Sequence, residues 1–149
     1  KFTDVPFSGT VTGKQQGSFR NGKRHGPWVG YWNNGQLKYK GDYKNGKREG
    51  AWVSYHKNGR LEFKGNYKNG KGEGERVVYN DSGTLMQKGT YKDGKKDGPW
   101  VDYHENGQLS FKGTYKDGKE EGQWVSFESD GTVNKEYTGT YKDGEKISD

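Results

Sequence analysis

The sequence has no cysteine, only three prolines and a single methionine, and hydrophobic residues make up just 26% of it. Without cysteine there are no disulfides, no thiol catalysis and no thiolate metal sites. No apolar run approaches the roughly 18 residues of a membrane-spanning helix, so the chain is not expected to be transmembrane. Its mean hydropathy of −1.40 also leaves too little aliphatic material for a compact two-layer core.

Aromatic residues are abundant, although the sequence has few hydrophobic residues overall. Low hydrophobicity together with 31% charged residues is typical of disordered chains. Here, however, there are 11 tyrosines, 6 phenylalanines and 5 tryptophans, and each such ring can bury on the order of 150–250 Å². The composition therefore predicts a thin fold that is stabilised by aromatic packing.

The charge balance is mildly basic. The net charge is +6, from 26 basic and 20 acidic residues, and the isoelectric point is about 9.3. This balance is compatible with an anionic partner such as nucleic acid, a lipid surface or an acidic protein, but the excess is too small to require one.

A 24-residue repeat organises nearly the whole chain. Two series of glycines keep this step without a slip, and a third keeps it up to a two-residue insertion. They are Gly26, Gly50, Gly74, Gly98 and Gly122; Gly35, Gly59, Gly83, Gly107 and Gly131; and Gly22, Gly46, Gly70, Gly94 and Gly118, followed by Gly144. A fixed period of this length is the signature of a repeat protein.

Each unit contains two short runs of β-branched and aromatic residues, and each run is closed by Asn-Gly or Asp-Gly, the pair that best tolerates the positive φ angles of a type I′ turn. The sequence therefore predicts an all-β fold, an elongated single-layer antiparallel β-meander of about six hairpin units. We expect one repeat domain over 1–149. It divides into an N-terminal partial or capping unit, four regular units, and a last unit with the insertion and a charged tail: 1–21, 22–45, 46–69, 70–93, 94–117 and 118–149.

The turns also predict the strand register. If Asn58-Gly59 is a two-residue loop, its two flanking residues pair with each other and Trp52 pairs with Gly65. If Asn69-Gly70 closes the next turn, Gly65 also pairs with Gly74. Both counts place one set of residues on the same face, where each tryptophan ring can cover a glycine. In this unit the set is Trp52, Leu61, Phe63, Gly65 and Tyr67.

The opposite face is expected to be the wetter one, a ladder of tyrosine rings with lysine stems laid across them. Tyrosine offers contact area at low entropic cost, so this face is the best binding hypothesis by residue type. Its candidate partner-binding residues are Tyr31, Tyr55, Tyr79, Tyr103, Phe127, Lys40, Lys64, Lys88 and Lys112. The alternative is that these rings and stems only shield the sheet from water.

The tryptophan face is expected to be structural, although in a one-layer sheet it should remain partly exposed. Its aromatic residues are Trp28, Trp52, Trp100, Trp124, Tyr43, Tyr67, Tyr91 and Tyr115.

The segment 39–50, Tyr-Lys-Gly-Asp-Tyr-Lys-Asn-Gly-Lys-Arg-Glu-Gly, resembles the MORN motif, in which aromatic residues alternate with glycine ahead of Gly-x-x-x-Gly. The motif recurs at 63–70 and 111–118. The 24-residue step and the additional Asn-Gly turn are most similar to the bacterial variant found in YwqK-family antitoxins. This resemblance implies a single-layer sheet of stacked hairpins and association with proteins or membranes, in some members as the neutralising partner of a toxin. The sequence departs from the motif at Gln87, an aromatic position, and at Arg76, which replaces the tryptophan.

The histidines and carboxylates that could bind a metal or act in acid–base catalysis are expected to lie too far apart to form such a site. His56 and His104 occupy the same position two units apart, which in a sheet of this spacing is roughly 19 Å, whereas zinc ligands lie near 2 Å from one centre. His25 is likewise assigned to a turn or the surface. The acidic row Glu49, Glu73, Asp97 and Glu121 recurs roughly every 10 Å without an enclosing cleft, and is expected to be a solvated stripe partly neutralised by neighbouring lysines. We therefore predict no catalytic residue, no metal site, no cofactor and no enzymatic activity.

The resulting hypothesis is a bacterial, non-enzymatic binding scaffold whose partner is a protein, with a toxin as one candidate. The alternative is a binder of an anionic membrane surface, a polysaccharide or a nucleic acid through the Tyr/Lys face. The compartment stays open between the cytoplasm and export after removal of an N-terminal signal.

Overall fold

The computed structural model describes residues 6–149, and the first five residues of the expected N-terminal unit lie outside this part. The described residues form one antiparallel sheet of thirteen strands that follow one another in chain order, without a helix. The strands are β1 (Gly9–Val11), β2 (Gln15–Arg20), β3 (Lys23–Tyr31), β4 (Leu37–Lys44), β5 (Lys47–Tyr55), β6 (Leu61–Lys68), β7 (Lys71–Tyr79), β8 (Leu85–Lys92), β9 (Lys95–Tyr103), β10 (Leu109–Lys116), β11 (Lys119–Ser126), β12 (Gly139–Lys142) and β13 (Glu145–Ser148).

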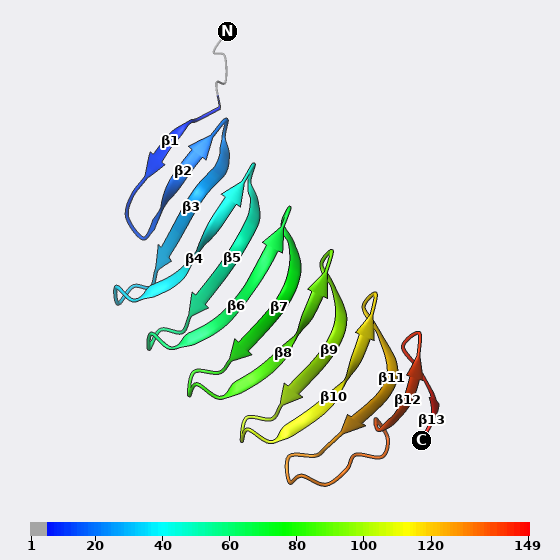
Figure 1. Cartoon of the computed structure of the whole chain (residues 1–149). Coiled ribbons are helices and arrows are strands. Elements are labelled where there is room, and N and C mark those ends of the chain that lie inside the picture. The colour runs from blue at the N-terminus through cyan, green and yellow to red at the C-terminus, as the bar shows by residue number, and fades with distance from the viewer. Residues whose placement is uncertain (1–5) are drawn as a thin grey trace.

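The sheet is an open, elongated ribbon. Figure 1 shows the hairpins following one another along a single axis, with the tight turns along one edge and the longer loops along the other. The prediction of an all-β, single-layer meander of 24-residue hairpins is confirmed. Both faces of the sheet are therefore available for side chains to pack on or to meet a partner.

The turns at one edge form as predicted. Asn69 and Gly70 have φ angles of 52° and 83°, and the flanking Lys68 and Lys71 pair with each other. Positive φ at both central positions is the requirement of a type I′ turn, and Asn-Gly or Asp-Gly meets it at the lowest cost. This edge is therefore fixed by local sequence.

The turns at the other edge differ from the prediction. Around Asn58-Gly59 only the glycine has a positive φ, of 83°. The His56 amide donates to the Arg60 carbonyl and the Gly59 amide to the His56 carbonyl, both at 2.9 Å, so the loop has three residues instead of two. The predicted pairing of the residues flanking Asn58-Gly59 is wrong.

A β-bulge restores the register further along the strands. Tyr55 pairs with Leu61, but Ser54 pairs with Phe63, so the residue between Leu61 and Phe63 is extra. Trp52 consequently pairs with Gly65, as predicted. Leu61 was predicted on the tryptophan face; its pairing with Tyr55 places it on the opposite face, because directly paired residues point to the same side of a sheet.

The next junction contains a larger irregularity. Asn66 pairs with Glu73, but Gly65 pairs with Arg76, so Gly74 and one neighbour bulge out of β7. The predicted pairing of Gly65 with Gly74 is therefore wrong. Gly74 has a φ of 74°, a left-handed conformation that glycine adopts without penalty. Equivalent shifts give Trp52 and Trp100 a glycine partner on both neighbouring strands, Gly41 and Gly65 for the first, and Gly89 and Gly113 for the second.

The core of this one-layer sheet is a row of tryptophans. Trp28, Trp52, Trp100 and Trp124 are only 2%, 3%, 1% and 5% exposed. The expectation of a partly exposed packing face holds for tyrosines such as Tyr43 and Tyr67, which are half-buried, but not for the tryptophans.

Three kinds of neighbour enclose the indole of Trp52. A Cβ on Gly41 would overlap the Trp52 ring, so this ring lies directly on the glycine backbone. Tyr43 and Tyr67 meet its sides in edge-to-face contacts, with ring centroids 5.1 and 6.3 Å away. The Arg48 guanidinium lies over it at 4.5 Å. Glycine beneath, tyrosines beside and a cation above thus bury a large ring without a second layer of secondary structure.

Candidate functional site

The face predicted to bind carries a row in which lysine and valine alternate from strand to strand. Lys64 on β6, for example, pairs with Val53 on β5 and with Val77 on β7. The lysines of the row are exposed and the valines half-buried. The complete row, which we call the Lys/Val row, is Val29, Lys40, Val53, Lys64, Val77, Lys88, Val101, Lys112 and Val125. Because neighbouring strands are about 4.8 Å apart, its lysines recur roughly every 10 Å.

The predicted tyrosines form a second row beside the first, nearer the three-residue loops. Tyr55 follows Val53 by two residues on β5, so both side chains point to the same face. Tyr55 pairs with Leu61, and equivalent pairs join Tyr31, Tyr79 and Tyr103 to Leu37, Leu85 and Leu109. These tyrosines are half-buried. Phe127 lies just beyond β11, where it forms an isolated bridge with Val133. The structure thus brings the predicted residues together as two parallel rows.

The charged groups of the lysines are not placed over these tyrosine rings. Within residues 6–149, no cation lies over the rings of the tyrosine row. Lys88 instead forms an exposed ion pair with Glu75 at 3.6 Å. Lys40, Lys64 and Lys112 make no ion pair with any described residue. Their charges are consequently available to a partner.

A half-buried tryptophan that sequence reasoning passed over lies at the loop edge. Trp32 comes directly after Tyr31, a member of the tyrosine row. The ammonium groups of Lys38 and Lys57 lie 4.2 and 5.5 Å from the centre of its ring. Its indole N–H donates to the carbonyl of Tyr55 at 2.9 Å. The signal was present in the repeat, because position 32 aligns with His56 and His104 after steps of 24 residues.

The two aligned histidines, like Trp32, each donate a hydrogen bond to a backbone carbonyl of the next unit. Nε2 of His56 donates to the Tyr79 carbonyl at 2.9 Å, and Nε2 of His104 donates to the Phe127 carbonyl at 2.8 Å. Each of these side chains therefore ties its own unit to the next one along the ribbon. They are structural links, and no group of histidine, aspartate and glutamate side chains within residues 6–149 could hold a metal ion.

The acidic row is also structural, which corrects the expectation of a solvated stripe. Oε2 of Glu49 accepts a hydrogen bond from the Asn69 amide at 2.8 Å, in the tight turn of the following unit. The equivalent bonds run from Asp93 to Glu73, from Asp117 to Asp97 and from Asp143 to Glu121. A carboxylate that accepts from a backbone amide makes one of the stronger kinds of protein hydrogen bond. Both edges of the ribbon are thus tied from unit to unit by side chains.

The tryptophan face presents perturbed ionisable groups, but each has a packing cause. Burial lowers the pKa of Lys96, against the opposing effect of Asp102 and Glu120. Burial and then the charge of Glu120 raise the pKa of Tyr115, whose hydroxyl donates to that carboxylate at 3.1 Å. Lys96 lies over the Trp100 ring at 4.2 Å, so it completes a tryptophan enclosure.

Comparison with known proteins identifies the repeat. Four consecutive segments, residues 24–45, 48–69, 72–93 and 96–117, match the family model described as MORN repeat variant, and together they cover more than half of the chain. No curated protein matches the chain. No helix in the described part of the chain is long and apolar enough to cross a membrane.

Proposed function

We propose that this chain, which belongs to the MORN repeat variant family, binds a partner protein along the face of the Lys/Val row. The repeats of this family are in general non-catalytic scaffolds that bind proteins or membranes. The observation that supports this choice is the continuity of that face. Exposed lysines and half-buried valines alternate across β3 to β11, and the tyrosine row runs alongside. Such a strip offers both apolar contact and regularly spaced positive charge.

The partner that fits this strip is an elongated protein surface with acidic groups at intervals of about 10 Å, the spacing of the lysines. Acidic groups at that interval could each meet one lysine, while apolar side chains between them meet valine and tyrosine. The area of the strip grows with the number of repeats, so affinity can be reached without a deep pocket.

The test is capture of a partner from the native host by the intact chain, compared with two charge-reversal variants. Lys64→Glu combined with Lys112→Glu reverses two unpaired lysines of the row. Lys135→Glu combined with Lys142→Glu changes the net charge equally at exposed lysines outside it. We expect the first pair to weaken capture about tenfold or more, equivalent to about 1.4 kcal/mol, and the second pair to leave it unchanged. Failure to recover any protein with folded bait, or equal loss in both variants, would refute the proposal.

We further propose a bacterial toxin as the partner, on the basis of the motif's similarity to the YwqK-family antitoxins. A toxin bound along the strip would be neutralised by coverage of its surface and not by chemistry. Co-expression with a toxin encoded beside this chain should restore growth, and the Lys64→Glu, Lys112→Glu variant should restore it less. Growth arrest that persists with the unmodified chain present would exclude this partner.

The second candidate is an anionic membrane or polymer, which the unpaired charges of Lys40, Lys64 and Lys112 favour. Binding of that kind weakens steeply as salt rises, because it releases counterions. Sedimentation with vesicles that contain anionic lipid, at low and at high salt, separates it from protein capture. Retention that does not depend on salt or on anionic lipid would exclude it.

A further inference from the structure

The third regular unit lacks the ring that defines the tryptophan face. Steps of 24 residues from Trp28 and Trp52 lead to Arg76, and then to Trp100 and Trp124. A second difference accompanies the first. The residue four positions before the tryptophan is a cation in three of the other units, namely Arg24, Arg48 and Lys96, but in the third unit it is Gly72.

The two differences compensate for one another in charge but not in volume. Nη1 of Arg48 donates to the Tyr67 hydroxyl at 3.1 Å, and Nη1 of Arg76 donates to the Tyr91 hydroxyl at 3.3 Å. A guanidinium therefore still binds the equivalent tyrosine, although it comes from position 76 and not from position 72. Over Gly65, which corresponds to Gly41 beneath Trp52, only the edge of the smaller Phe63 ring takes the place of the indole.

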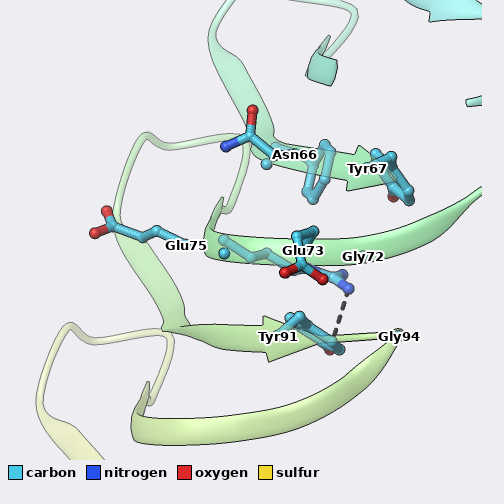
Figure 2. Close-up of a pocket in the computed structure, with 11 residues that line it drawn as sticks. Asn66, Tyr67, Gly72, Glu73, Glu75, Tyr91 and Gly94 are labelled. Atoms are coloured by element: carbon cyan, nitrogen blue, oxygen red, sulfur yellow. Dashed lines mark hydrogen bonds between the residues drawn. The ribbon is translucent and has the colours of Figure 1, made fainter. Parts of the chain in front are cut away.

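A cavity of about 170 Å³ lies at this position, and its lining includes Gly65 and Arg76, the pair that corresponds to Gly41 and Trp52. Figure 2 shows it between the tyrosines of β6 and β8, with Tyr67 on one side and Tyr91 on the other. Phe63, the Gly72–Arg76 segment and Asn66 complete its walls. A protein cavity of about 150 Å³ with apolar walls is large enough to bind benzene, so this one can admit a single aromatic ring.

The remaining walls match those around the indoles that are present. Trp52 is flanked by two tyrosine edges, and Trp100 likewise by Tyr91 and Tyr115 at 5.5 and 5.6 Å. This position keeps its two tyrosines and a cation, since the Arg76 guanidinium lies 5.5 Å from the Tyr91 ring centre, as the Arg48 guanidinium lies 5.2 Å from that of Tyr67. Nε of Arg76 is buried and makes no hydrogen bond to a described residue.

An acceptor for an indole N–H is also in place. Nε1 of Trp28 donates to the Ser18 carbonyl, and Nε1 of Trp52 donates to the Asp42 carbonyl, 24 residues further on. The next step of 24 residues is Asn66, which lines the cavity. The other two tryptophans do not use this acceptor, since Trp100 donates to Oδ2 of Asp102 and Nε1 of Trp124 makes no hydrogen bond to a described residue. The copies of the niche at Trp28 and Trp52 thus indicate which group fits the one beside Arg76.

We propose that the cavity beside Arg76 is a socket for a tryptophan side chain of a protein that binds the tryptophan face, on the side of the sheet opposite the Lys/Val row. This inference rests on the proposed scaffold function. The inserted indole packs between the edges of Tyr67 and Tyr91 and beneath the Arg76 guanidinium. Buried tryptophans of this kind are the residues that most often dominate the energy of an interface. The socket also fixes where along an otherwise repetitive ribbon the partner binds, because it occurs in only one of the five units with this position.

The first test uses N-acetyl-L-tryptophanamide as a probe of the intact chain, followed by NMR. We expect saturable shifts of the Gly65, Gly72 and Arg76 signals, with a dissociation constant of about 1 mM, and intermolecular NOEs from the indole to the Tyr67 and Tyr91 rings. The leucine analogue should cause neither. Shifts that do not saturate, or NOEs that map elsewhere, would overturn the proposal without any variant.

The second test fills the socket from within. Arg76→Trp restores the regular unit and should abolish probe binding and weaken capture of the protein that binds the tryptophan face about tenfold or more. Glu105→Trp adds a tryptophan on an exposed loop outside the socket and should change neither. Equal capture of every recovered protein by Arg76→Trp and by the unmodified chain would overturn the socket, while the loss caused by Lys64→Glu with Lys112→Glu would still stand as a separate measure of binding at the opposite face.

Discussion

Replacing one glycine by alanine beneath a tryptophan should test the packing principle of the whole ribbon. The proposed change is Gly41→Ala, and its matched control is Gly65→Ala one unit later. Both glycines have backbone angles outside the left-handed region, so alanine fits either backbone. They differ in what lies above them. A Cβ on Gly41 overlaps the Trp52 indole, whereas a Cβ on Gly65 comes within 2.8 Å of only the edge of the Phe63 ring.

The magnitude follows from the burial of the displaced ring. An indole that lost all of its buried area, on the order of 150–250 Å², would cost about 4–6 kcal/mol at about 25 cal/mol per Å². Overpacking that displaces a ring only in part costs about 1–3 kcal/mol. Since Trp52 is 3% exposed and enclosed on all sides, we expect Gly41→Ala to lower the free energy of unfolding by about 2–4 kcal/mol.

The control should behave differently because the Phe63 ring has room to move toward the cavity beside Arg76. Alanine also restricts the unfolded chain, which contributes about 0.4–1 kcal/mol of stability where the backbone is compatible. Gly65→Ala is therefore expected to lie within about 1 kcal/mol of the unmodified chain. Urea unfolding followed by far-UV circular dichroism measures both variants. Equal effects of the two substitutions would refute the account of rings packed on glycine.

Three further predictions concern single contacts. Trp100→Ala, at a residue 1% exposed, should cost about 3–5 kcal/mol in urea unfolding, whereas Trp32→Ala at the half-buried loop edge should cost clearly less; similar losses would contradict the assignment of the core. Glu73→Ala should accelerate hydrogen exchange of the Asp93 amide while leaving the Asn69 amide unchanged, because each carboxylate serves only the next turn; unchanged exchange at Asp93 would exclude this link. Folding raises the pKa of Tyr115, so the contribution of its neutral hydroxyl to stability is complete below pH 10 and is lost as the pH rises above 10. Tyr115→Phe should therefore lose less stability at alkaline pH than the unmodified chain. Identical pH profiles of the two proteins would contradict this prediction.

Features set by a few adjacent residues could be predicted from the sequence. The turn at Asn69-Gly70 forms as expected because its geometry depends on two residues that tolerate positive φ. The same dipeptide at Asn58-Gly59 forms a three-residue loop, since Asn-Gly suits both turns. The choice between them is made by the β-bulge after Leu61, which local sequence does not specify. The fold was thus predictable, whereas the register near the bulges was not.

Contacts between units were beyond prediction for a related reason. The acidic row was recognised as a periodic feature, but the acceptor role of Glu49 depends on how closely the Asn69 turn stacks on it. At the candidate face, alternation placed the lysines and tyrosines correctly, while the neighbours of each lysine followed from the register. Arg76 is a visible departure from the motif, but the cavity beside it also depends on Gly72, which lines the same space without a side chain.

The side-chain links at the two edges of the ribbon, made by the acidic row and by His56, His104 and Trp32, run in one direction along the chain. Glu49 reaches forward to the turn at Asn69, and His56 reaches forward to Tyr79, so every unit supplies groups that complete its successor. A duplication or deletion of 24 residues would therefore leave each junction with the same donors and acceptors. The length of the ribbon, and with it the size of partner it accommodates, can be changed in whole steps by recombination without redesign of the packing.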